Sequence, residues 1–127
     1  MADFSATYTA KRGLTAGHAL DSQQTFDIDL RQLDLIDEIK ATQNLTPSDA
    51  ETEFESFSTL YKVETRLMDK PTMLLCREFL LSCSASELFT VSLEGAPVQN
   101  AHLLLDKKLK PSRQQLKYRY QFDIRVY

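Results

Sequence analysis

The end of the chain, from Gln115 to Tyr127, alternates strictly between apolar and polar side chains. Successive side chains of a β-strand point to opposite faces of the sheet, so this spacing places every apolar group on one surface. Most of these residues are aromatic or β-branched, which suits a half-buried strand. The pattern predicts a long terminal strand over 115–127 with a dry face made of Leu116, Tyr118, Tyr120, Phe122, Ile124 and Val126.

Four earlier stretches also read as strands. Residues 5–10 and 25–30 alternate, and in the second of them Phe26, Ile28 and Leu30 would face the core while Asp27 and Asp29 point outward. Residues 87–93 and 102–106 follow in the second half of the chain. Gly and Pro clusters separate these runs, as is usual for the turns between strands.

Residues 31–60 allow more than one interpretation. Between 31 and 50 the apolar positions fit either a short helix or the start of a strand, and Pro47 in the turn-forming segment 44–49 prevents a helix from continuing. From 51 to 67 the content favours a strand, although Phe54 and Phe57 are out of phase with Tyr61. A bulge between Phe54 and Tyr61 would restore the phase, and a helix over 50–60 is the alternative.

One helix is predicted over 71–83. Asp69 is a suitable N-cap and Pro71 suits the first turn, where its missing N–H needs no partner. The apolar side of this helix is broad, so it should pack on a sheet, with Arg77 and Glu78 at the solvent edge.

The order of strands, one helix and further strands predicts a mainly β, α+β fold: an antiparallel β-sandwich or split barrel with one packed α-helix at about 71–83. A length of 127 residues suits a single domain, 1–127. The core should form from the helix and the strands at 25–30, 87–93 and 115–127. We expect a soluble protein, since neither a signal peptide nor a membrane-spanning run is visible.

The net charge of −3 is unevenly distributed. Residues 101–127 hold seven Lys or Arg against Asp106 and Asp123, so this segment carries +5 and the rest of the chain −8. Such asymmetry suits nucleic-acid binding, head-to-tail assembly or a solvated outer face. In the terminal strand, however, cations and aromatics alternate and so occupy opposite faces, whereas a base-stacking platform needs both on one face. Nucleic acid is therefore the less favoured partner.

Catalytic and metal motifs are weak. Cys76 and Cys83 lie roughly 10 Å apart along a helix, too far for a disulfide, and read as buried thiols. His18 and His102 stand alone, outside any spacing that presents metal ligands together. The pair Asp27 and Asp29 reads as a solvated edge rather than an acid/base couple. We therefore expect no enzyme, no cofactor, no metal and no small-molecule substrate.

Two segments resemble small tail-tip proteins, the distal-tail or minor-tail components, of long-tailed bacteriophages. The first runs from Tyr8 through Gly17-His18 to the alternating residues 26–30, and the second comprises Arg77-Glu78-Phe79-Leu80, Ser82, Glu87, Phe89 and Gly95. The resemblance implies a non-enzymatic structural protein of the virion tail, assembled in the host cytoplasm. It further implies a homo-oligomeric ring that connects the tail tube to hub, fibre or receptor-binding proteins.

In such a ring an acidic patch on one subunit can meet a basic patch on the next. The residues predicted to form these contacts are Lys11, Arg12, His18, Lys107, Lys108, Lys110, Arg113, Arg119 and Arg125. The alternative function is a nucleic-acid-binding accessory protein that uses the basic C-terminal hairpin.

Overall fold

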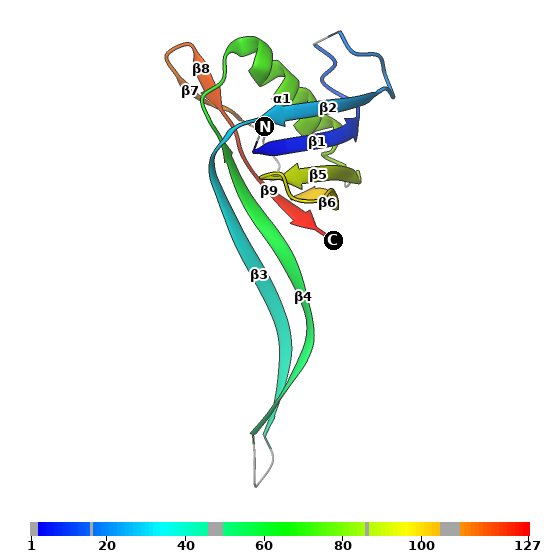
Figure 1. The fold of residues 1–127 in the computed structure, drawn as a ribbon, viewed down its shortest axis with the longest axis vertical. Coiled ribbons are helices and arrows are strands. Elements are labelled where there is room, and N and C mark those ends of the chain that lie inside the picture. Colours follow the sequence, from blue (N-terminus) through cyan, green and yellow to red (C-terminus); the bar gives the residue numbers. More distant parts are fainter. Residues whose placement is uncertain (1–2, 16, 46–49, 86, 105–109) are drawn as a thin grey trace.

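The structure is a computed structural model that describes residues 3–15, 17–45, 50–85, 87–104 and 110–127, with only the backbone described over 39–45 and 50–57. Nine strands and one helix follow one another along the chain (Figure 1). They are β1 (Phe4–Thr9), β2 (Gln23–Ile28), β3 (Leu30–Leu45), β4 (Ala50–Thr65), α1 (Lys70–Ser82), β5 (Phe89–Leu93), β6 (Gln99–Leu104), β7 (Ser112–Gln114), β8 (Lys117–Arg119) and β9 (Gln121–Val126). The predicted class, a mainly antiparallel β fold with one packed helix, is confirmed.

Seven strands form one antiparallel sheet in the order β2-β1-β5-β6-β9-β4-β3. The two edge strands, β2 and β3, are consecutive in the chain and are joined by Asp29 alone. In a flat sheet of seven strands the two edges would lie too far apart for a single residue to connect them. The sheet must therefore curl until its two edges approach each other at Asp29. Bonds across this corner hold it together, because Leu30 donates its N–H to the Asp3 carboxylate (3.1 Å) and Arg66 donates to the Asp29 carbonyl (3.4 Å). The body is therefore a split barrel.

The core is organised around Phe79 of α1, which is completely buried. Aromatic rings from four different strands surround it with centroid distances of 5.0–6.1 Å, mostly edge to face: Phe4, Tyr8, Phe26, Phe89 and Phe122. Aromatic pairs in this geometry add roughly 0.5–1.5 kcal/mol each beyond the burial of their area. The helix thus closes the concave side of the curled sheet. The inward residues of 25–30, 87–93 and the terminal strand lie in this core, as the alternation predicted.

The helix begins where the sequence predicts. The Asp69 carboxylate accepts a hydrogen bond from the N–H of Thr72 (3.1 Å), and Pro71 occupies the first turn. These contacts with Thr72 lower the pKa of Asp69. Within the part of the chain that the structure describes, no helix has both the length and the apolarity needed to cross a membrane.

The predicted terminal strand is interrupted. Tyr120, Phe122, Ile124 and Val126 are buried as expected, but Leu116 is 76% exposed. The reason is a small hairpin of β7 and β8, which reverses at Gln115, a residue with φ of 56°. The alternation continued through this turn, so the sequence pattern alone did not reveal the break.

Residues 31–60 form the longest strands in the molecule. The strand interpretation holds for both β3 and β4, and the helical alternative over 50–60 is wrong. The predicted bulge between Phe54 and Tyr61 is present: Lys40 pairs with Ser56 and Ala41 with Phe54, which leaves Glu55 as the extra residue. The turn predicted at 44–49 falls largely on residues outside the described ranges.

Candidate assembly surfaces

The outer part of the β3–β4 hairpin extends away from the body as a two-stranded arm (Figure 1). Strand β9 accompanies β4 only as far as the pair Thr59 and Val126, and β3 pairs with β4 from Leu30 to Leu45. We define the arm as residues 38–58, beyond that pairing. At about 3.3 Å per residue, the eight residues of β3 in the arm give it a length of roughly 26 Å. A projection of this length is unusual in a chain whose other sheet strands have five or six residues.

The arm is acidic. Residues 38–58 contain five acidic side chains against Lys40 alone, and the acidic positions are Glu38, Asp49, Glu51, Glu53 and Glu55. Like charges in one place repel one another, so this composition suits a partner of opposite sign better than burial within the chain.

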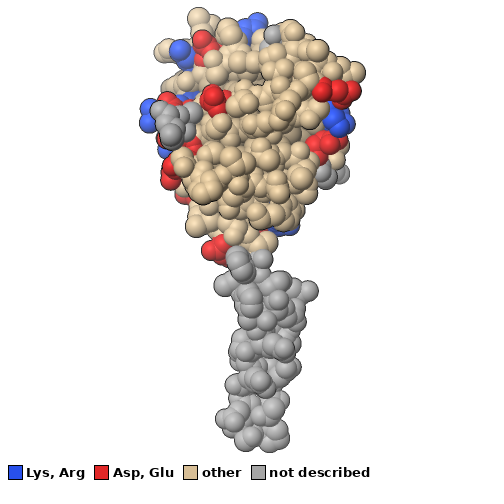
Figure 2. Space-filling model, turned by 45° about the vertical axis from the view of Figure 1, so that its right-hand side comes forward, with Lys and Arg blue, Asp and Glu red and all other residues tan. Residues whose placement is uncertain are grey.

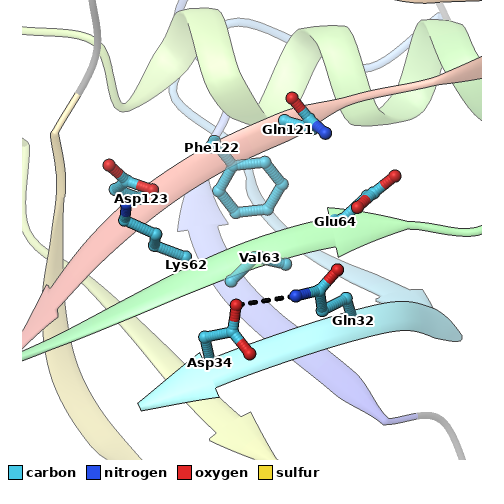
Figure 3. A pocket seen from close by; sticks show the side chains of 8 residues that line it. All are labelled: Gln32, Asp34, Lys62, Val63, Glu64, Gln121, Phe122 and Asp123. Atoms are coloured by element: carbon cyan, nitrogen blue, oxygen red, sulfur yellow. Dashed lines mark hydrogen bonds between the residues drawn. The ribbon is translucent and has the colours of Figure 1, made fainter. Parts of the chain in front are cut away.

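A shallow hollow of about 200 Å³ lies at the root of the arm, on β3, β4 and β9 (Figure 3). Its walls combine both signs of charge with two amides: Gln32, Asp34, Lys62, Glu64, Gln121 and Asp123, over Val63 and Phe122. The amide of Gln32 donates to the Asp34 carboxylate (2.7 Å), and Glu64 accepts from Arg31 (3.0 Å) and Arg119 (3.3 Å). Ligand pockets usually span about 300–1,000 Å³ and are mostly apolar, so this hollow is better suited to a surface contact.

The end of the body opposite the arm holds the first turns of α1 and the β7–β8 hairpin (Figure 1). A mainly apolar groove of about 410 Å³ lies there, lined by Thr15, Lys70, Pro71, Leu74 and Leu75. The β7–β8 hairpin is tied to the start of the helix through reciprocal backbone bonds between Met68 and Tyr118 (2.7 and 2.8 Å). We call this region, the groove together with the β7–β8 hairpin, the head end.

Four cations at the head end are exposed: Lys70, Lys110, Arg113 and Lys117. Lys117 contributes to the lowered pKa of Asp69, after the hydrogen bonds from Thr72. The guanidinium of Arg113 donates to the Gln115 carbonyl (3.0 Å) and lies over the Tyr118 ring, 6.0 Å from its centroid. Both contacts are within the β7–β8 hairpin and fix the orientation of this side chain. On the face seen in Figure 2, charged side chains lie mainly at the margins of the body and its broad centre is uncharged.

The predicted basic set is therefore divided by the fold. Lys110 and Arg113 are at the head end, whereas Arg119 pairs with Glu64 and Arg125 approaches Glu38 (3.8 Å) on the sheet. Lys107 and Lys108 lie outside the described residues. Because the cations of this set that the structure describes are divided between the head end and the sheet, the described residues offer the nucleic-acid alternative no continuous basic track.

The predicted loop residues Lys11, Arg12 and His18 contact α1 or the residues that follow it, and Arg12 remains exposed. Lys11 pairs with Glu87 (3.2 Å), and Arg12 donates to the carbonyls of Leu81 and Ser82 at the end of the helix. The loop fits closely, since a Cβ at Gly13, whose φ is +67°, would lie 2.9 Å from the Leu81 side chain. This loop is thus a structural part of the body, although it also supplies Thr15 to the groove.

A buried carboxylate on α1 contacts the same loop, and its location was predicted wrongly from the sequence. Glu78 was expected at the solvent edge of the helix but is completely buried. Its Oε2 accepts from the Tyr8 hydroxyl (2.7 Å) and contacts Nδ1 of His18 (2.5 Å). Burial, together with the Glu78 carboxylate, raises the pKa of Tyr8 well above its usual range. The helix is buried on almost all sides near its C-terminus, and the apolar periodicity does not reveal this.

The two cysteines are free and buried, as predicted, and burial raises the pKa of Cys83 to about 12 and that of Cys76 still further. Such thiols are poor nucleophiles because the thiolate is the reactive form. His102 bonds the Tyr127 hydroxyl (2.8 Å). Among the residues that the structure describes, no group of three or more His, Cys, Asp or Glu could hold a metal ion.

Comparisons with known proteins give a similarity in structure. No protein-family model matches the sequence, and no curated protein matches it. Among solved structures, the chain is similar to a chain from the tail of an empty GTA particle that was computed with helical refinement and C6 symmetry. The TM-score is 0.55 at 11% identity, and the match covers 98% of this chain and 91% of the other. The protein therefore shares the fold of a chain in an assembled tail.

Proposed function

We propose that this protein is a structural subunit of a phage-type tail, which assembles into rings that stack along the tail axis. The observation that carries the proposal is the extent of the structural similarity. It covers nearly the whole of both chains, so it includes the arm as well as the body, and the other chain belongs to a tail with helical and C6 symmetry.

The shape of the chain supports this role. Its arm and its head end lie at opposite ends of the molecule, so a contact between them joins two different surfaces (Figure 1). Contacts between unlike surfaces propagate from copy to copy and build rings or filaments. The edge strands β2 and β3 offer further backbone groups for contacts around a ring, because an edge strand has one unpaired side.

In this role the protein is a building block and uses neither a cofactor nor a small-molecule substrate. Its main partner is a second copy of itself, and its place is the virion tail after assembly in the host cytoplasm. The uncharged centre of the face in Figure 2 and the inert thiols are consistent with a structural part.

A ring at the tail tip is the second candidate position. The resemblance of residues 8–30 and 77–95 to distal-tail and minor-tail proteins favours it. A tip ring would bind the tail tube on one side and hub or fibre proteins on the other. The helical arrangement of the similar structure favours a ring that repeats along the tail.

Mass photometry and negative-stain electron microscopy of the purified protein test the proposal. We expect rings in equilibrium with monomers, with their fraction increasing with protein concentration. Repeating subunits should give stacks of many rings, whereas a tip subunit should give single rings that bind one end of tubes made from the tube protein. A monomer at every concentration, with no association with tube protein, would overturn the proposed function.

A gel shift with duplex DNA at two salt concentrations separates the nucleic-acid alternative. Binding through phosphates weakens steeply with salt. We expect no shift at about 150 mM salt, since Arg119 and Arg125 are already engaged by carboxylates.

A further inference from the structure

We propose that His18 and Glu78 form a pH-sensitive latch, which holds one loop of the body closed over the C-terminal half of α1 and loosens as the pH rises past neutrality. We call this loop the strap and define it as residues 10–15, 17 and 18. The inference goes beyond the proposed function, because the latch lies within one chain and acts in a monomer as well as in a ring. Loosening of the strap also changes the head end, since the strap supplies Thr15 to the groove there.

The strap is attached to α1 at two points. At its start, the N–H groups of Lys11 and Arg12 donate to the Ser82 hydroxyl (2.9 and 3.2 Å). At its end, Nδ1 of His18 lies 2.5 Å from Oε2 of Glu78. Positions 78 and 82 are four residues apart and therefore lie on the same side of the helix, one turn from each other. Of the two attachments, the second contains a histidine, the side chain whose charge ordinarily changes near neutral pH.

The carboxylate of the latch is incompletely compensated without His18. Glu78 is completely buried, and its Oε2 accepts a further hydrogen bond from the Tyr8 hydroxyl (2.7 Å). Among the residues that the structure describes, Oε1 of Glu78 has no hydrogen-bond partner. A buried carboxylate is costly unless an opposite charge compensates it. The imidazole of His18 can supply this charge, and because its side chain is 27% exposed it can still exchange its proton with solvent.

Protonation of the imidazole sets the direction of the switch. When His18 is protonated, the contact is a charge-assisted hydrogen bond, which is roughly twice as strong as a neutral one. When His18 is neutral, Nδ1 can still donate in one tautomer, but the buried carboxylate loses its opposite charge. The contact therefore favours the protonated imidazole in the closed strap. By linkage, its contribution to closure is present at the lower pH and is lost as the pH rises.

The other ionisable groups that the structure places around the latch are not expected to respond over the same range. On β1, burial raises the pKa of Tyr8 well above its usual range, so its hydroxyl stays protonated. On and after α1, burial also raises the pKa of the thiols of Cys76 and Cys83. The remaining neighbours are cations and carboxylates, side-chain types that ordinarily titrate outside about pH 5.5–8: Lys11, Arg12, Arg77, Asp21 and Glu87.

Hydrogen exchange measured by mass spectrometry tests the latch in the wild-type chain, at a concentration at which mass photometry shows monomers. Each exchange rate is divided by the rate of an unstructured peptide at the same pH, so the resulting protection factor reports only the opening of the strap. We expect strap peptides to be at least about fivefold better protected at about pH 5.5 than at about pH 8, the factor that separates a charge-assisted from a neutral hydrogen bond.

The chain has two histidines, which provides a matched control. His18→Gln keeps a hydrogen-bond donor for Glu78 but cannot become charged, so strap protection should be equal at the two pH values. His102→Gln changes the histidine that contacts Tyr127, and should keep the wild-type difference. Glu78→Gln removes the carboxylate at nearly constant size and should also equalise the two values. Circular dichroism verifies the fold of each variant, and if Glu78→Gln does not fold, the partly exposed His18→Gln still decides.

Three results would overturn the latch: equal strap protection at both pH values in wild type, a pH difference that survives in His18→Gln, or one that disappears in His102→Gln. Because the measurement is made on monomers, each of these results leaves the proposed assembly into rings untouched. Conversely, a chain that shows the expected pH difference but never forms rings would keep the latch, while the proposed function fails.

Discussion

The body and the arm of this protein are built from the same sheet but are stabilised in different ways. In the body, seven strands curl around Phe79 and bury a continuous core. In the arm, β3 and β4 continue as a pair that the remaining sheet strands no longer accompany. An isolated two-stranded hairpin is marginally stable in water. The difference indicates that the body supplies most of the stability of the fold and that the arm adds little to it.

The largest expected effect on the body comes from Phe79→Ala. The ring is completely buried and touches aromatic side chains from four strands, so its loss leaves a cavity at the centre of the core. We expect the free energy of unfolding to fall by about 3–5 kcal/mol. Urea denaturation measures it. Leu116→Ala, at a position that is 76% exposed, is the control and should change stability by less than about 0.5 kcal/mol.

A smaller loss is expected from Tyr8→Phe, which removes one donor from the buried Glu78 carboxylate and keeps the ring against Phe79. Leaving a buried charge with fewer hydrogen bonds costs about 1–3 kcal/mol. Denaturation of Tyr118→Phe, whose ring is only half-buried, provides the matched comparison. Equal stabilities of Tyr8→Phe and wild type would show that the Glu78 contact contributes nothing to the body.

Alkaline pH should destabilise the body progressively. Burial raises the pKa of Cys83 from 9.0 to about 12 and that of Tyr120 from 10.0 to about 12. The folded chain therefore holds protons that the unfolded chain releases. Stability is fully present below about pH 9 and declines above it, by up to about 1.4 kcal/mol per pH unit for each group. Urea midpoints at pH 8, 9.5 and 10.5 measure the slope, which Cys83→Ala should make shallower.

The smallest effect on stability should come from shortening the arm. Replacement of residues 41–55 by a two-residue Asn-Gly turn, which joins the pair Lys40 and Ser56, removes the outer pairs of β3 and β4 but touches nothing in the core. We expect the unfolding free energy to change by less than about 1 kcal/mol, since loop length affects stability only weakly. The same variant should keep the secondary structure of the body, as circular dichroism would show. A large loss of stability would contradict the division between body and arm.

The sequence predicted the body better than the surfaces. Alternation located the buried faces of β2, β5 and β9, and the cap at Asp69 located the helix, because both signals are local. The bulge at Glu55 was also readable, from the phase of Phe54 against Tyr61. The local pattern did not predict the curl of the sheet, because the curl depends on the pairing of strands that are distant in the sequence.

The surroundings of the predicted contact residues could not be predicted for the same reason. Arg12 and His18 stand in a loop bracketed by glycines, and the fold brings this loop against α1, where Ser82 and Glu78 contact them. The burial of Glu78 depends on Tyr8, which lies 70 residues earlier in the chain. The groove at the head end combines residues 15 and 70–75, so sequence spacing gave no indication of it.

Apart from the bulge at Glu55, β3 and β4 pair regularly in the arm, and this pairing restricts how the length of the arm can vary among related chains. Side chains alternate between faces with a period of two, so adding one residue to each strand would exchange the faces of everything beyond it. Only insertions of two residues in each strand keep the alternation of faces unchanged beyond the insertion, and each lengthens the arm by roughly 6.6 Å. The length of the arm can therefore change in discrete increments and not continuously.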